Sequence, residues 1–345
     1  MEVLYIDTSI FEGNNFFESH RIQELYRLSQ EEKVKVLMPE LTYDEIRNRL
    51  HINVIEAHKK FNKYRTDTRV LRNVPSLNDK FNEFDLALIT DEIDQLLTKK
   101  FIESKFVIID YPQINIGNVF KKYFASEFPF SSGKKKNEFP DAFALVSVEK
   151  WAQEHKKQVI LFSKDNDLLK YETPFLVIND SFEDYINDKI REDEDNKKRI
   201  EMVDEFIRSS PHDVLSIISE WTRDELYDDR HYLEFTNYHE IHNIEVGVVD
   251  SEIEGYKITQ AGEDYIAVQM KVLVSFHVDL TIDDEDYMMK DDDTKEWIYL
   301  DTTVKGLDDT KYIDIDVTFY PDDKGNLDFD IEQINLGKKL KISGV

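Results

Sequence analysis

Residues 3–9 read VLYIDTS, and residues 159–167 read VILFSKDND. Each stretch begins with four apolar residues, which is typical of a strand buried on both faces of a parallel sheet. Each stretch then turns acidic, at Asp7 in the first and at Asp165 in the second. Ligands of open parallel sheets bind outside the carboxyl ends of the strands, where the strand order reverses. The two stretches therefore predict an α/β fold with an acidic site at that edge of its sheet.

The rest of the first half alternates short apolar runs with longer helical patterns, as a parallel α/β sheet requires. Further strands are predicted at residues 34–38, 106–109 and 174–178, and helices at 18–31, from Pro39 through Ile55, at 79–103 and at 139–151, with a short helix after Asp165. Pro39 suits the first position of its helix, where a missing N–H costs nothing.

Two more acidic residues lie inside predicted helices, Glu45 in PELTYDEI and Asp141 in the otherwise apolar FPDAFAL. Taken singly, Asp7 and Asp165 could cap the helices that follow them, Glu45 could be solvated, and Asp141 could be a first-turn acid favoured by the helix dipole. Clustered together, the four carboxylates would repel one another and need cations to neutralise them. The chain has no cysteine, so a metal would be held by oxygen or imidazole, which favours Mg²⁺ or Mn²⁺ over structural zinc.

The segments IDTSIF, PELTYDEI, FPDAFAL and LFSKDNDLL, in this order, resemble the four acidic motifs of PIN-domain nucleases. The resemblance covers about residues 1–180, and FPDA and the S-K-D-x-D segment are its most specific parts. It implies a PIN-like parallel sheet, ordered 3-2-1-4-5, between helices. It also implies that Asp7, Glu45, Asp141 and Asp165 are the catalytic, metal-binding acids, with Asp167 as a further ligand or support.

The activity implied by this resemblance is Mg²⁺- or Mn²⁺-dependent endonucleolytic hydrolysis of phosphodiester bonds, most often in RNA, by two-metal-ion in-line attack of water. Thr8, Ser9 and Ser163 would support the acids, and Ser163 takes the place of a hydroxyl residue that is common before the last Asp.

Two alternatives to an endoribonuclease stay open. The first is a structure-specific or single-strand DNA nuclease, because nothing in the sequence separates RNA from DNA. The second is a catalytically silent PIN-like regulatory or binding protein, although retention of all four acids argues against it. A haloacid-dehalogenase-type phosphatase is rejected, because Ser9 stands where that family needs a second Asp.

The chain departs from the resemblance by a long insertion between Glu45 and Asp141 and by a strongly acidic extension. Of the net charge of −28, residues 1–180 carry −3 and residues 181–345 carry −25. We predict a PIN-like nuclease domain at 1–187, an exposed, charged helical connector at 188–210, and a smaller acidic β-rich (α+β) domain at 211–345. Alternating strands at 265–282 and 312–320 support the β-rich assignment.

The charge asymmetry predicts different partners for the two halves. A strongly acidic surface repels phosphodiester backbones, so we expect nucleic acid, RNA more than DNA, to bind the N-terminal domain. The acidic C-terminal domain is expected to contact a protein partner or a second copy of the chain. No signal peptide or membrane-spanning run is evident in the sequence, so we expect no membrane contact and a cytoplasmic location.

Smaller motifs carry weaker expectations. Lys134, Lys135 and Lys136 lie just before the Asp141 motif and could guide a nucleic-acid backbone towards the metals. A second basic run extends from Lys59 to Arg72, and a solvated surface is the more common meaning of such a run. His231, His239 and His242 could bind a metal, but histidines in such groups are usually structural or exposed. The acidic clusters at 283–293 lack the spacing and the glycine of an EF-hand.

Overall fold

The computed structural model describes residues 1–78, 84–110, 115–130, 139–228, 241–290, 297–322, 324–338 and 340. It divides into two compact units, Met1–Ile186 and Asn187–Val345. No described helix is long and apolar enough to cross a bilayer.

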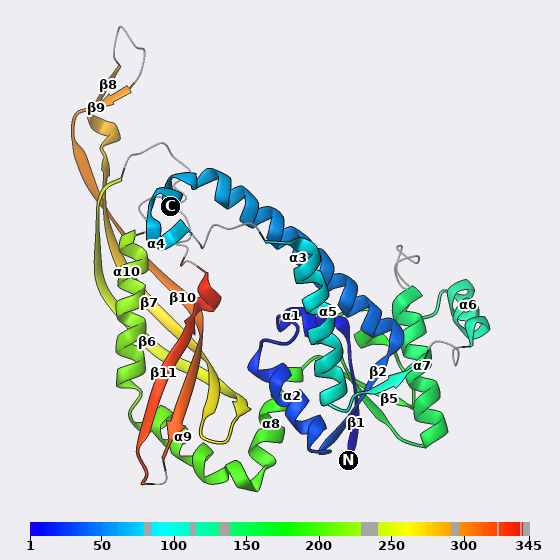
Figure 1. Ribbon diagram of the computed structural model, residues 1–345. Coiled ribbons are helices and arrows are strands. Elements are labelled where there is room, and N and C mark those ends of the chain that lie inside the picture. Colours follow the sequence, from blue (N-terminus) through cyan, green and yellow to red (C-terminus); the bar gives the residue numbers. More distant parts are fainter. Residues whose placement is uncertain are drawn as a thin grey trace. The chain divides into compact units, whose positions relative to one another are not determined.

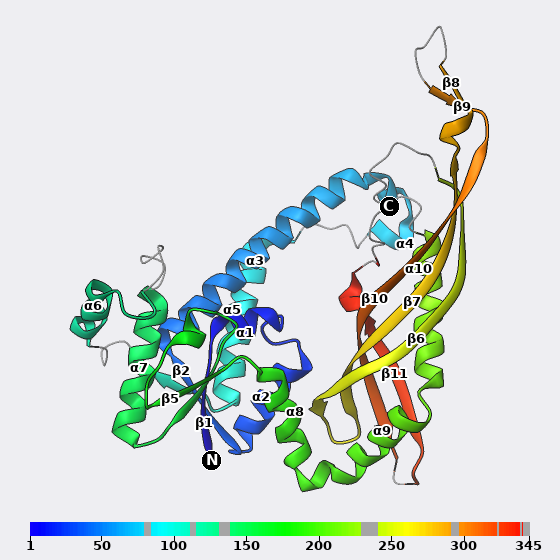
Figure 2. The same ribbon diagram turned by 180° about the vertical axis from the view of Figure 1, so that it is seen from behind.

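The first unit is built on a five-stranded parallel sheet with the order β3-β2-β1-β4-β5 (Figures 1 and 2). The strands are β1 (Glu2–Ile6), β2 (Val34–Pro39), β3 (Val107–Ile109), β4 (Val159–Phe162) and β5 (Leu176–Asn179). This is the order that the sequence predicted, so the α/β fold with a PIN-like sheet is confirmed. The strand order reverses between β1 and β4, which places the ends of these two strands side by side at the switch point.

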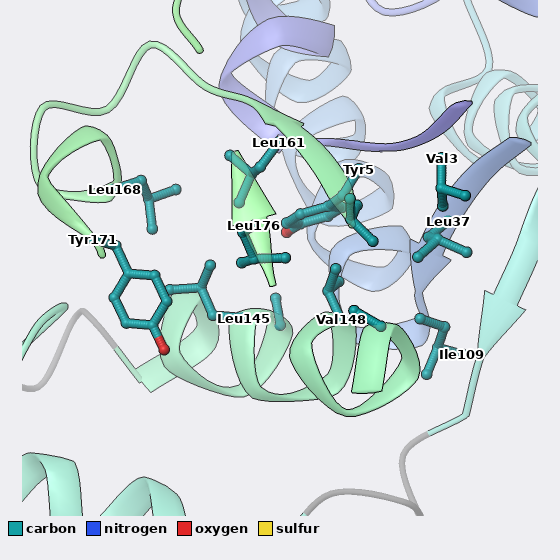
Figure 3. Close-up of a cluster of buried hydrophobic side chains, with 13 residues drawn as sticks. Val3, Tyr5, Leu37, Ile109, Leu145, Val148, Leu161, Leu168, Tyr171 and Leu176 are labelled. Atoms are coloured by element: carbon teal, nitrogen blue, oxygen red, sulfur yellow. The ribbon is translucent and has the colours of Figure 1, made fainter. Parts of the chain in front are cut away.

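Helices flank this sheet on both sides (Figures 1 and 2). The helical elements of the first unit are α1 (Thr8–Gly13), α2 (His20–Gln30), α3 (Glu40–Asp67), η1 (Arg69–Asn73), α4 (Pro75–Asn78), α5 (Leu86–Glu103), α6 (Ile116–Ala125), α7 (Phe139–His155) and η4 (Leu168–Lys170). Figure 3 shows one buried layer, in which Leu145 and Val148 of α7 pack against Tyr5 of β1 and Leu161 of β4. Because these side chains are almost completely buried, they fix α7 against the sheet.

Two features of α3 differ from the prediction. Pro39 is the last residue of β2 and the N-cap of α3, so the helix begins one residue later, at Glu40. The helix also continues well past Ile55, to Asp67. Its buried residues are Thr42, Ile46 and Leu50, all near its beginning. The distal part therefore lacks the apolar face by which helices are recognised in a sequence.

The second unit contains a curved four-stranded antiparallel sheet with the order β11-β10-β7-β6 (Figures 1 and 2). Its strands are β6 (Ile241–Ala261), β7 (Ile266–Asp283), β10 (Thr302–Pro321) and β11 (Leu327–Ile334), and β8 (Met288–Lys290) pairs separately with β9 (Trp297–Tyr299). The helices are the end of α8 (Phe182–Glu192), η5 (Glu194–Asn196), α9 (Lys197–Ser209) and α10 (His212–Asp228), and the short turns η6 (Glu285–Tyr287) and η7 (Asn335–Gly337) complete the unit. The predicted β-rich extension is confirmed.

The segment at 188–210, predicted to be an exposed connector, instead belongs to the core of the second unit. Ile200, Val203 and Ile207 of α9 are buried, and Phe206 packs its ring against Phe319 and Phe329 of the sheet. Charged residues occupy the outer face of α9, so its sequence looks solvated although one face is apolar.

Candidate active site

Asp7 stands where β1 ends and α1 begins, at the carboxyl edge of the sheet. Its backbone N–H donates to the carbonyl of Phe162 at the end of β4, with an N–O distance of 2.9 Å. Its side chain caps α1 by accepting from the backbone N–H of Ser9 at 3.2 Å. The carboxylate is only 6% exposed. Capping was one reading of this residue from sequence, and the structure adds that the capping group is buried at the switch point.

Two serine hydroxyls join Asp7 to the loop after β4. Ser163 Oγ donates to Asp7 Oδ2 at 2.9 Å and accepts from the backbone N–H of Asp165 at 3.0 Å. Ser9 Oγ also donates to Asp7 Oδ2 and accepts from the backbone N–H of Lys164 at 3.0 Å. Both hydroxyls therefore hold the loop against the same carboxylate oxygen. Support of a catalytic site by Ser9 and Ser163 stays a prediction.

Glu45 lies on the first part of α3, beside the core-facing positions Ile46 and Thr42. Its side chain is 28% exposed and Arg49 Nη2 lies 3.6 Å from Oε1. Burial raises the pKa of Glu45, the negative charge of Asp7 raises it further, and the Thr8 hydroxyl and Arg49 only partly offset these effects. The charge of Asp7 thus acts on Glu45 in the direction expected for neighbouring carboxylates.

Asp141 lies in the first turn of α7 and is half-buried. Ala142 and Val146 of the same helix pack with Val119 of α6 and with Phe130. This small apolar cluster holds the start of α7 in place and so determines where Asp141 lies.

The pKa of the fully buried phenol of Tyr5 is affected by three of the acids. The Oη of Tyr5 lies 3.0 Å from Thr42 Oγ1. Burial is the main reason that the pKa of Tyr5 is raised well above its usual value, and the negative charges of Asp7, Asp141 and Glu45 raise it further. One strand end, one helix interior and one helix start therefore bring their carboxylates near a single phenol.

The donors around this phenol fit a hard divalent cation. Carboxylate and hydroxyl oxygens are the ligands that Mg²⁺ and Mn²⁺ prefer. The Thr8 hydroxyl is buried and makes no hydrogen bond of ordinary geometry within the described residues, although it lies near enough to Glu45 to lower the pKa of that carboxyl. A buried hydroxyl beside two carboxylates is a polar group for which a cation shell offers a partner.

The structure does not bring every predicted ligand together. Among the described residues, no three acidic or histidine side chains lie close enough to hold one ion in this arrangement. Asp165 is exposed, and its Oδ1 accepts from the backbone N–H of Asp167 at 2.6 Å. Asp167 Oδ1 lies 3.8 Å from the ammonium group of Lys170. Asp165 is thus tied to Asp7 through Ser163, while metal binding by Asp165 and Asp167 stays a prediction.

Two sets of predicted residues lie partly or wholly outside the described structure. Lys134, Lys135 and Lys136 are outside the described residues, as are His231 and His239. His242 is described, and its Nε2 lies 2.6 Å from Oδ1 of Asp283.

Reasoning from sequence did not identify Tyr5, Thr42 and Arg49 as members of the site. Tyr5 carries the one polar side-chain atom in the apolar run VLYI of β1. Thr42 and Arg49 lie three residues before and four residues after Glu45, which places all three on one face of a helix. These signals are present in the sequence, but they indicate a site only once the packing of α3 against β1 is known.

Residues 4–168 match the sequence profile of the PIN-domain family. Residues 4–168 of the N-terminal unit therefore form a PIN domain. The match includes Asp7, Glu45, Asp141 and Asp165, and the PIN fold is a nuclease-type fold, generally of metal-dependent RNA or DNA nucleases. Searches of curated proteins and of solved structures each gave no match.

Proposed function

We propose that the chain is a metal-dependent endonuclease that hydrolyses phosphodiester bonds, in RNA more readily than in DNA. The observation that carries this proposal is that the charges of Asp7, Glu45 and Asp141 all act on the buried phenol of Tyr5, a residue of β1 beside the switch point of a PIN sheet. Such a concentration of negative charge costs free energy in the absence of cations. Because bound divalent ions would relieve this repulsion, the site is suited to bind such ions together with an anionic substrate.

The acidic residues of the site have different roles in this proposal. Asp7, held by two serine hydroxyls, is the fixed carboxylate of the site. Glu45, with its raised pKa, would act from α3, and Asp141 would act from the first turn of α7. Asp165 would contribute from the loop after β4, with Asp167 in support. When bound, one or two Mg²⁺ or Mn²⁺ ions would lower the pKa of an attacking water and neutralise the scissile phosphate.

Arg49 and the protein surface around it would orient the substrate. The Arg49 guanidinium lies within 4.0 Å of carboxylate oxygens of Glu12 and Glu45, and its side chain is 50% exposed. A half-exposed guanidinium beside the acids can donate to two oxygens of one phosphate in a bidentate manner. In this way it would hold the strand so that the scissile phosphate faces the carboxylates.

For the second unit we propose a role in recruiting a protein partner or a second copy of the chain. This proposal is supported by the net charge of −25 beyond residue 180, because such a charge disfavours contact with a polyanion. A DNA nuclease and a catalytically silent PIN protein are the alternatives to the main proposal, and the following test separates them.

The test uses the purified full chain with end-labelled RNA and DNA strands of identical sequence, with Mn²⁺, with Mg²⁺ and with a chelator. We expect metal-dependent cleavage of RNA, and loss of that cleavage in Asp141→Asn, because Asn keeps the shape of the side chain but lacks its charge. The control is Asp184→Asn, an acid of α8 outside the site. Cleavage of DNA alone would replace the substrate assignment. An Asp141→Asn variant that cuts like wild type would refute the site, and a folded wild-type chain inert in both metals would support the silent alternative.

A further inference from the structure

The distal part of α3 and the turn η1, residues 51–73, carry an unusual excess of positive charge. Six residues are basic, Lys59, Lys60, Lys63, Arg65, Arg69 and Arg72, while only Glu56 and Asp67 are acidic. The chain as a whole carries a net charge of −28. We call residues 51–73 the basic arm.

The basic arm has no hydrophobic core of its own. None of the described residues from 51 to 96 is buried, although both α3 and α5 run through this range. Figures 1 and 2 show α3 extending far beyond the sheet of its unit. The ring of Phe61 stacks on Phe84 at 4.4 Å, and His58 Nε2 lies 3.3 Å from the carbonyl of Phe84. These contacts join the distal part of α3 to the segment before α5 without burying either of them. They therefore contribute little stability and leave the surface of the arm accessible.

Five of the six cations of the arm have no acidic partner among the described residues. In the part of the chain that the structure describes, none of Lys59, Lys60, Lys63, Arg69 and Arg72 forms an ion pair. Basic residues nearer the sheet behave differently: Arg47 pairs with Asp94 at 2.6 Å, and Arg27 pairs with Glu24 at 2.6 Å. Unneutralised cations along one exposed segment favour a polyanionic partner.

One continuous helix connects the lysines of the arm to the candidate active site. Glu45 and Lys59 are both on α3, which contains neither glycine nor proline between Glu40 and Asp67. At about 1.5 Å per residue, Lys59 lies roughly 21 Å and Lys63 roughly 27 Å along the helix axis from Glu45. For a base-stacked strand, in which successive nucleotides rise about 3.4 Å along the axis, this corresponds to roughly six to eight nucleotides.

We propose that the basic arm binds the phosphate backbone of the nucleic-acid substrate, about six to eight nucleotides from the bond that is cut. The inference rests on the proposed function of the acidic site, whose substrate it describes further. The exposed ring of Tyr64, four residues after Lys60, adds an aromatic surface to the same arm. Aromatic rings beside cations are how proteins hold single strands without reading their sequence.

The test measures binding separately from cleavage. The full chain, with a chelator present, is titrated against fluorescent single strands of RNA or DNA of about 20 nucleotides, at several salt concentrations between about 50 and 200 mM. The variant is Lys59→Gln, Lys60→Gln and Lys63→Gln combined. The matched control, Lys150→Gln, Lys156→Gln and Lys157→Gln, removes the same charge at the end of α7, which lies at the opposite end of the helix from Asp141.

Each lost phosphate contact should reduce the slope of log affinity against log salt by about 0.7, so the arm variant should lose about 2 units of slope and about 100-fold in affinity at 0.1 M salt. The control should retain the wild-type slope to within about 0.5. An arm variant with the wild-type slope would overturn the proposal.

The outcome separates this proposal from the proposed function. A chain that cuts RNA while the arm variant keeps its salt slope has an active site but no binding arm. A chain that cuts nothing while the arm variant loses slope has the binding arm without the nuclease. RNA and DNA strands compared in parallel show whether the arm distinguishes the two backbones, and equal effects on both are expected from contacts to phosphate alone.

Discussion

Replacing Ser163 by alanine should destabilise the first unit by about 2–3 kcal/mol. The Ser163 side chain is fully buried, and its Oγ donates to the Asp7 carboxylate at 2.9 Å. A hydrogen bond to a charged group contributes about 1.5–3 kcal/mol. The second bond, accepted from the backbone N–H of Asp165 at 3.0 Å, adds at most about 1 kcal/mol, because water can replace it at an exposed residue.

A matched control is available in α7. Ser147 is also buried, but its Oγ donates to the carbonyl of Phe143 in the same helix, at 2.7 Å. Alanine at this position loses one local hydrogen bond and gains helix propensity, so Ser147→Ala should cost less than about 1 kcal/mol. The difference between the two variants isolates the cost of separating Asp7 from the loop after β4.

The assay is urea unfolding followed by tryptophan fluorescence. Trp221 and Trp297 are first replaced by Phe, so that Trp151 of the first unit is the only reporter. The midpoint should fall in Ser163→Ala with little change in the denaturant slope. In the nuclease assay the same variant should lower kcat more than it raises KM, because Asp7 is then less well held. If Ser163→Ala costs no more than Ser147→Ala, the loop is not fastened through Asp7 and our account of the site is wrong.

Three other changes test the electrostatics of the two units. Burial and the charge of Asp7 raise the pKa of Glu45, so the contribution of Glu45 to stability is present below the pKa of the unfolded chain and is lost as pH rises through the folded value. Without metal, Glu45→Gln should therefore melt at a higher temperature than wild type at neutral pH, and this difference should close as pH falls towards 4. Equal melting temperatures at every pH would contradict this. Mn²⁺ at about 100 times its Kd should add about 2.7 kcal/mol of stability to wild type and clearly less to Asp7→Asn, measured by thermal shift against a chelator blank; equal shifts would remove Asp7 from the metal site. In the second unit, burial alone would raise the pKa of Asp204, but hydrogen bonds from Arg191 and Tyr256 outweigh it and lower the pKa, so its stabilisation is present above the unfolded pKa and is lost as pH falls through the folded value. Asp204→Asn should thus be less stable than wild type at neutral pH and approach it in acid, and a difference in melting temperature that does not depend on pH would refute this ion pair as the cause.

Much of the first unit could be predicted from sequence because its signals are local. Four apolar residues followed by a change to polar residues define β1 and β4 and place Asp7 and Asp165 at their ends, whatever the rest of the chain does. The strand order then followed from the motif resemblance. The same local reasoning failed for α9, where charged residues on one face concealed the buried positions Ile200 and Val203.

Only the tertiary structure decided how the acids relate to one another. Glu45 and Asp141 are about 100 residues apart in the chain, and their common position near Tyr5 depends on how α3 and α7 pack on the sheet. No periodicity encodes that distance, because each helix is positioned by contacts with side chains remote in sequence. The same holds for the basic arm: the composition shows its charge, but whether cations are neutralised depends on which carboxylates folding brings within reach. Local patterns determine elements and their ends, whereas the charges that surround each functional group are set by packing.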